Sequence, residues 1–139
     1  MLKTILSISG KSGLYKMVSK GKNMLIVESI SVEKKRFPAY TNEKIISLSD
    51  IAIYTDSGET PLRDVLTSIK EKENGATLSF DIKKATSEQL RTYMAEVLPN
   101  FDREKVYIAD IKKLFLWYNL LITNGITEFK KEEKQEISE

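Results

Sequence analysis

The stretch LYKMVSKGKNMLIVESIS, residues Leu14–Ser31, decides the fold of the N-terminal part of the chain. Two apolar, β-prone runs flank the polar turn Lys20–Asn23, an arrangement typical of a β-hairpin. Pro38 lies inside the later run Arg36–Tyr40, and a proline at such a position is typical of an edge or bulged strand. Short strands at this spacing, without a helical period, predict a small five-stranded barrel of the SH3 or Tudor type. The further runs lie on both sides of the hairpin and are separated by polar turns: Leu2–Ser9, Arg36–Tyr40, Ile45–Leu48 and Ile51–Thr55, the last two joined by a tight or 3₁₀ turn at Ser49-Asp50.

From Thr60 onward the pattern becomes helical. Thr60-Pro61 predicts a helix start, with Pro at the first helical position, and apolar residues then follow at helical spacing up to Asn74-Gly75. Residues 76–82 are compatible with one more short strand or an extended linker. Thr86 and Gln89 form a capping box for a second helix, which Pro99 ends. A third helix is capped by Asp102 or Asp110 and closes at Asn124-Gly125.

The two patterns together predict an α+β protein. We expect a small SH3- or Tudor-like barrel over residues 1–57 and a helical part of about three helices over residues 58–125. Residues 126–139 are rich in Lys and Glu, and we expect a charged, disordered tail.

The composition excludes several chemistries. The 139 residues contain no Cys and no His, so zinc fingers, thiolate nucleophiles and histidine general bases are excluded. Gly10-Lys11-Ser12 looks like the end of a phosphate-binding loop, but Ile5 stands where that motif needs glycine. Asp102 and Asp110 are accounted for as helix caps rather than as an acid/base pair. We therefore expect no enzymatic activity, no cofactor and no metal.

Charge is distributed unevenly along the chain. Residues 1–44 hold nine basic residues and three acidic ones, a net charge of +6, and nothing before Glu28 is acidic. Such asymmetry is typical of a surface that meets a polyanion, although lysines that keep a sheet edge solvated are an alternative. Most of these lysines lie in predicted turns and could gather at one end of the barrel. The candidate nucleic-acid-binding residues are the basic side chains for phosphates and two rings for stacking on bases: Lys11, Lys16, Lys20, Lys22, Lys34, Lys35, Arg36, Tyr15 and Tyr40.

The last predicted helix offers a second possibility. The run Leu114–Ile122 is apolar nearly all round, so it is either buried or presents a second face to a partner. Leu116, Trp117 and Leu120 lie off the main apolar stripe and form a candidate protein interface. The leading hypothesis is thus a binding module for nucleic acid, with RNA favoured. The alternative is an adaptor for another protein, or a homodimer, that uses this helix face.

The first residues do not form a signal peptide. Ser7 and Ser9 interrupt the early apolar run, no small-residue cleavage site follows, and no segment has the ~20 apolar residues that span a bilayer. We expect a cytoplasmic protein without a membrane partner.

Six segments are considered together: Leu2–Lys11, Gly13–Lys16, Arg36–Ala39, Ile51–Thr55, Asp110–Leu114 and Trp117–Asn119. They resemble a family of small Bacteroidetes proteins that have no assigned activity. The resemblance implies a cytoplasmic bacterial protein with a small N-terminal barrel and a helical C-terminal part, and it supplies no functional residue.

Overall fold

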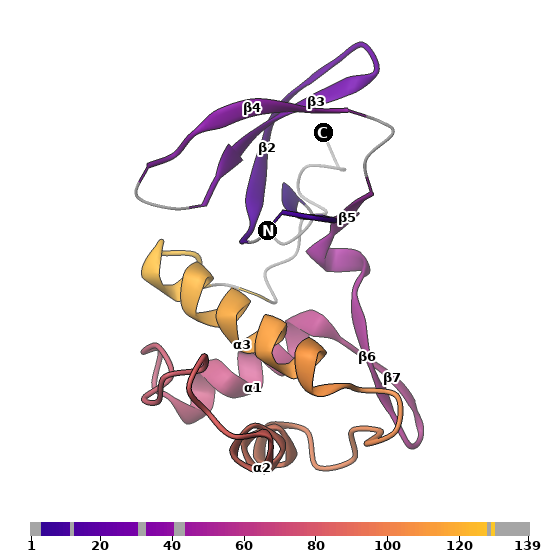
Figure 1. Cartoon of the computed structure of the whole chain (residues 1–139), viewed down its shortest axis with the longest axis vertical. Helices are drawn as coiled ribbons and strands as arrows, with labels where there is room; N and C mark the ends of the chain where they lie inside the picture. Colours follow the sequence, from indigo (N-terminus) through magenta and orange to yellow (C-terminus); the bar gives the residue numbers. More distant parts are fainter. Residues whose placement is uncertain (1–3, 12, 31–32, 41–43, 128, 130–139) are drawn as a thin grey trace.

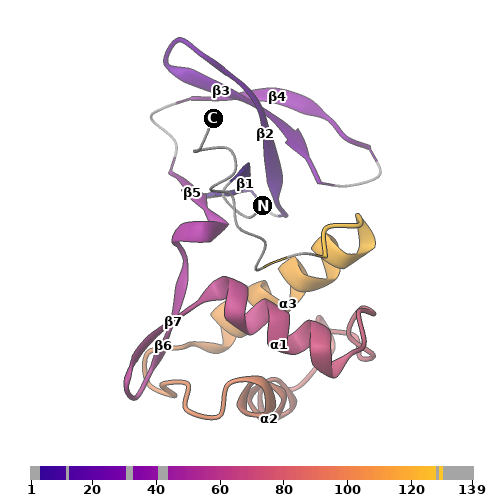
Figure 2. The same cartoon turned by 180° about the vertical axis from the view of Figure 1, so that it is seen from behind.

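A β-rich layer and a helical layer make up the part of the chain that the computed structural model describes, which is residues 4–11, 13–30, 33–40, 44–127 and 129 (Figure 1). Helix α3 runs between the sheet and the other two helices, and the view from behind shows the same order (Figure 2). The α+β class is as predicted. In chain order the described elements are β1 (Ile5–Ile8), β2 (Tyr15–Gly21), β3 (Met24–Ser29), β4 (Arg36–Tyr40), β5 (Ile45–Ser47), the 3₁₀ turn η2 (Leu48–Asp50), β6 (Ala52–Thr55), β7 (Gly58–Pro61), α1 (Leu62–Lys72), α2 (Ser87–Val97) and α3 (Ile108–Thr123).

Strands β1 to β5 form an antiparallel sheet in the order β4-β3-β2-β1-β5. The predicted hairpin is confirmed as β2 and β3, with Asn23 in the left-handed conformation at the turn. Strands β4 and β5 are the two edges, and the described residues include no hydrogen-bonded pairing between them. The sheet is therefore open in this part of the chain, and the predicted closed barrel is not confirmed.

Of the last two predicted runs, only the first joins the sheet. Ile45–Leu48 contains β5, which pairs with β1, and the expected 3₁₀ turn follows it. Ile51–Thr55 contains β6, which forms a separate hairpin with β7. Gly58 at the turn has a φ of 127°, which favours glycine, and the Thr55 hydroxyl donates to the Gly58 carbonyl over 3.1 Å. Helix α1 begins at Leu62, directly after the predicted start at Thr60-Pro61. Pro61 is the last residue of β7 and the N-cap of α1 rather than its first helical residue.

Two clusters of apolar side chains stabilise the packing of the sheet and of the helices. The smaller lies on the inner face of the sheet and is built on Leu6, Ile8, Val27 and Ala39. The larger joins the three helices to the sheet through residues such as Ile5 and Leu48. In the larger cluster, the buried residues of α1 are Leu62, Val65, Leu66 and Ile69, which is the apolar stripe at helical spacing seen in the sequence.

Capping groups that the sequence indicated form hydrogen bonds at the starts of α2 and α3. Thr86 accepts a hydrogen bond from the Gln89 N–H over 3.0 Å, and Asp110 accepts one from the Tyr107 N–H at the start of α3. Residues 76–82 form no strand. Of the predicted disordered tail, residues 128 and 130–139 lie outside the described residues, whereas Phe129 is buried beside Tyr118. The division at residues 57 and 58 stays a prediction, and the β6–β7 hairpin spans it.

Candidate binding surfaces

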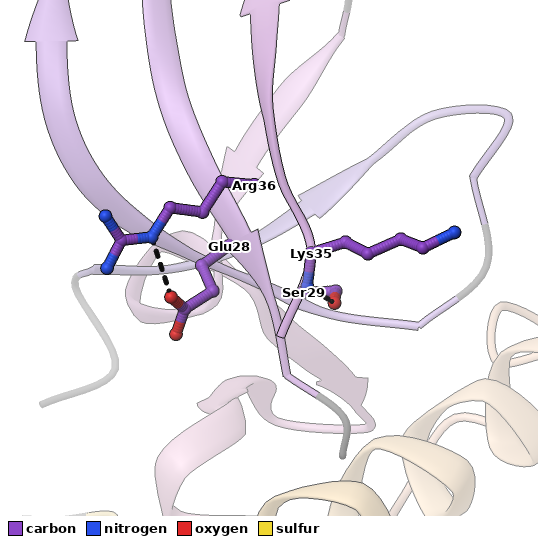
Figure 3. Close-up of polar contacts among 4 residues, drawn as sticks. All are labelled: Glu28, Ser29, Lys35 and Arg36. Atoms are coloured by element: carbon purple, nitrogen blue, oxygen red, sulfur yellow. Dashed lines mark hydrogen bonds and ion pairs between the residues drawn. The ribbon is translucent and has the colours of Figure 1, made fainter. Parts of the chain in front are cut away.

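One face of the sheet brings three of the predicted nucleic-acid-binding residues together. Lys16 and Arg36 both pair in register with Glu28, from strands on either side of it, so all three side chains lie on one face. Tyr40 lies four residues along β4 from Arg36 and therefore on the same face, and it is 52% exposed. The Arg36 Nε is 2.9 Å from the Glu28 carboxylate, an ion pair that Figure 3 shows on the outside of the sheet. We call this face, with Lys16, Arg36 and Tyr40, the outer face.

The hairpin tip carries two exposed cations, Lys20 and Lys22, at the end of the sheet where Tyr40 lies. Lys20 pairs with Leu25, which in turn pairs with Ala39 of the smaller apolar cluster, so its side chain leaves β2 on the inner face. Lys22 lies in the turn itself. The tip therefore adds positive charge at this end of the sheet, but Lys20 does not belong to the outer face.

Lys34 and Lys35 lie at the opposite end of β3, so the turn lysines do not gather at one end. The Lys35 N–H donates to the Ser29 hydroxyl over 2.9 Å, and its side chain leaves β4 on the side opposite to Arg36 (Figure 3). The physical reason is the meander itself, because successive turns of antiparallel strands alternate between the two ends of the sheet.

Tyr15 and Lys11 belong to the inner face. The Tyr15 ring is half-buried and meets Phe37 edge-to-face, with 5.3 Å between ring centroids. The Lys11 ammonium stands 5.1 Å from the centroid of the Phe37 ring. Tyr15 and Tyr40 are thus on opposite faces of the sheet and cannot form one stacking platform.

The α3 residues that were predicted as a protein interface differ in exposure. Leu116 is 41% exposed, Leu120 is partly buried and Trp117 is only 8% exposed. All three line a groove of about 600 Å³ between α3 and the β1–β2 turn. Lys11 lines the same groove, so one member of the basic set and the whole apolar set meet here, which the sequence did not indicate.

Three further lysines line this groove and were not singled out from the sequence. Lys112 and Lys113 come from α3, and Lys83 comes from the segment before α2. Lys112 precedes Leu116 by four residues and Lys113 precedes Leu120 by seven, a spacing that places them along one helix face. That spacing is the feature of the sequence from which the two α3 lysines could have been predicted to lie beside Leu116 and Leu120. We call the space lined by Ile8, Lys11, Lys83, Lys112, Lys113, Leu116, Trp117 and Leu120 the α3 groove.

A second hollow of about 330 Å³ lies on the other side of Trp117. It shares Ser7, Lys113 and Trp117 with the α3 groove and continues towards β5 and β6 through Ile46 and Ile53. The two spaces form one elongated depression with the indole between them.

The buried polar groups of the helical layer support its packing. The Tyr93 hydroxyl donates to the Glu73 carboxylate over 2.5 Å, and the Tyr118 hydroxyl donates to the Ala76 carbonyl over 2.6 Å. Burial, and then the nearby Glu73 carboxylate, raises the pKa of Tyr93 and raises the pKa of Tyr118 to about 12. Both phenols therefore stay protonated and act as donors that tie the end of α1 to α2 and α3.

The described part of the chain contains neither a cluster of metal-binding side chains nor a membrane-spanning helix. No three side chains of His, Cys, Asp or Glu gather there as a metal site. None of the helices described has the length and apolar character required to cross a bilayer.

The chain matches known families over nearly its whole length. The family model "Domain of unknown function (DUF6852)" matches residues 51–121, and "Domain of unknown function (DUF5606)" matches residues 2–48. A solution NMR structure of a protein from Bacteroides vulgatus is 62% identical, with 93% of this chain and 91% of that chain covered and a TM-score of 0.77. No curated protein matches the chain. Since the first family model covers just over half of the chain and the Bacteroides protein nearly all of it, the chain belongs to the DUF6852 family, in agreement with the Bacteroidetes resemblance seen in its sequence.

Proposed function

We propose that the chain is a non-enzymatic binding module whose outer face binds single-stranded RNA. The observation that carries the proposal is the exposed ring of Tyr40 on the same sheet face as Lys16 and Arg36. The tip lysines Lys20 and Lys22 add positive charge at the same end of the sheet as Tyr40. Proteins that bind single strands combine a positively charged track for the backbone with exposed aromatic rings on which bases stack. The cytoplasmic location expected from the sequence is part of the proposal.

The finer fold assignment belongs to the same proposal. A flat sheet of five strands would hold its two edges roughly 19 Å apart, at about 4.8 Å per strand. Tyr40 at the end of β4 and Lys44 before β5 are four residues apart, which allows at most about 14 Å. The sheet must therefore curl strongly, and we assign it to the open SH3- or Tudor-like barrels.

Salt dependence measures how many cations contact the RNA. With Lys16, Lys20, Lys22 and Arg36 on four phosphates, the affinity for a labelled oligouridylate should fall about 50-fold between 50 and 200 mM salt. Fluorescence anisotropy at the two salt concentrations gives this ratio. Absence of binding at 50 mM salt would overturn the proposal.

Two matched double variants test the location of the site. Changing Lys20→Gln and Lys22→Gln removes two of the four cations, so the same salt increase should then cost only about sevenfold. Changing Lys34→Gln and Lys35→Gln removes the same charge from the other end of the sheet and should leave both affinity and salt dependence unchanged. An equal loss in the two variants would show a diffuse attraction rather than an outer-face site.

Variants of Tyr40 test whether its ring stacks on the bases of the RNA. Tyr40→Ala should weaken RNA binding by about 5- to 150-fold, whereas Tyr40→Phe, which keeps the ring, should retain it. Equal affinities of the two variants would exclude Tyr40 as a stacking residue. Melting curves of both variants show whether each is folded.

A further inference from the structure

The α3 groove is lined by lysines, which we call its rim, and by apolar side chains, which we call its floor. Lys11, Lys83, Lys112 and Lys113 line it together with Ile8, Leu116 and Leu120, and its lining includes no acidic residue. Its volume of about 600 Å³ lies within the usual range of ligand sites. The ligand that this surface complements is therefore negatively charged and carries bulky apolar groups.

Trp117 provides an independent indication of a ligand. It is 92% buried, with 8% of its surface exposed, and it lines both the α3 groove and the adjoining hollow. Among the described residues its indole N–H donates no hydrogen bond, although buried tryptophan N–H groups usually have an acceptor. An acceptor in the depression that Trp117 lines would satisfy this donor.

The shape favours an extended ligand with several charges. The depression continues past Trp117 into the second hollow, whose lining adds Lys105 and Asp110. The four lysines of the α3 groove come from the β1–β2 turn, from the segment before α2 and from α3. A single small anion would engage only part of this rim. A second copy of the chain docked groove to groove would bring like charges together, because a twofold interface pairs a surface with itself.

We propose that the α3 groove binds an acidic segment of a partner protein, with its apolar side chains against Ile8, Leu116 and Leu120 and its carboxylates on the rim lysines. A backbone carbonyl of the segment accepts the hydrogen bond from the Trp117 indole. The aliphatic floor favours leucine-like side chains over nucleobases, whose polar edges would find few partners on it. This site is separate from the outer face, so the chain has two ligands of different classes.

Trp117 is the only tryptophan of the chain, so its fluorescence reports directly on this site. The probe is a short capped peptide that alternates glutamate and leucine, added at low salt, and its matched control carries glutamine in place of glutamate. We expect the acidic peptide to shift the emission of Trp117 and to bind at least tenfold more tightly than the control. No shift with the acidic peptide, or equal binding of the two peptides, would overturn the proposal.

Two groove variants and one control variant locate the binding. Lys112→Gln with Lys113→Gln should weaken peptide binding by about tenfold. Leu116→Gln should weaken binding without unfolding the helix, because Leu116 is 41% exposed and its polar replacement can reach water. Lys20→Gln with Lys22→Gln should leave peptide binding unchanged while it reduces RNA binding. Failure of this proposal is thus distinguishable from failure of the proposed function.

Other occupants would give different results. If decanoate shifts the Trp117 emission as strongly as the peptide at equal concentration, the groove is a small-molecule site and the peptide proposal is wrong. If an oligouridylate displaces the peptide from wild-type protein, the groove belongs to the RNA surface and the proposal is equally wrong.

Discussion

Replacing Trp117 with alanine should destabilise the protein rather than merely break an association. A tryptophan side chain of roughly 200 Å² that is 92% buried removes about 180 Å² from water, worth about 4.5 kcal/mol at 25 cal/mol per Å². The alanine Cβ retains part of this burial free energy, and water can enter the vacated space from the two adjoining hollows. The loss of stability therefore lies near the lower end of the usual range for truncation of a buried Trp to Ala, at about 3 kcal/mol. For a chain of 139 residues this corresponds to a fall in Tm of about 10 °C.

Thermal denaturation followed by circular dichroism measures this change, and Leu116→Ala is the matched control. Leu116 is the neighbouring residue but is 41% exposed, so its truncation should cost about 1 kcal/mol, or about 3 °C. Sedimentation velocity on the same samples reports any change of mass. A fall in Tm below about 3 °C for Trp117→Ala, together with loss of a larger species, would refute the assignment of Trp117 to the core.

Two further predictions concern local contacts. Thr86→Ala removes the acceptor for the Gln89 N–H at the start of α2 and should lower the free energy of unfolding by about 1 kcal/mol in urea titrations, whereas Thr86→Ser should change it little. Stability should also fall as pH rises from about 10 to 12, because Tyr118 ionises near pH 10 in the unfolded chain while burial and Glu73 raise its folded pKa to about 12. Below pH 10 both states keep the proton and this contribution is complete; a urea midpoint that is the same at pH 8 and pH 11 would contradict it.

Local signals identified most elements, because their determinants lie within a few residues. The β2–β3 hairpin, the 3₁₀ turn, the Thr86 cap and the helix stop at Asn74-Gly75 all depend on such short-range chemistry. The helix start at Thr60-Pro61 was predicted to within one residue for the same reason. The local signal could not show that residues 58–61 also pair with β6, which makes Pro61 the N-cap of α1 rather than its first helical residue.

Closure of the sheet depends on pairing between distant segments. Apolar alternation along a strand is the same for an open and a closed sheet. Closure requires pairing between the edge strands β4 and β5, which the described residues do not show, and the last predicted run becomes β6, which pairs with β7 rather than with the sheet. No periodicity in the residues before Thr55 carries that information.

The candidate sites illustrate a similar limit on the use of charge. Residues 45–139 carry 13 basic and 17 acidic residues, so a count by segment points away from a cationic surface there. The α3 groove nevertheless takes three of its lysines from this segment and one, Lys11, from the basic N-terminal part. The net charge of a segment is a sum over all faces of its helices, whereas a ligand contacts one face. In physiological salt the screening length is about 8 Å, so the electrostatic attraction is confined to the charges on that face. Binding at the groove therefore depends on which lysines α3 and the β1–β2 turn bring together, and a net charge near zero for the whole chain is compatible with two strongly cationic surfaces.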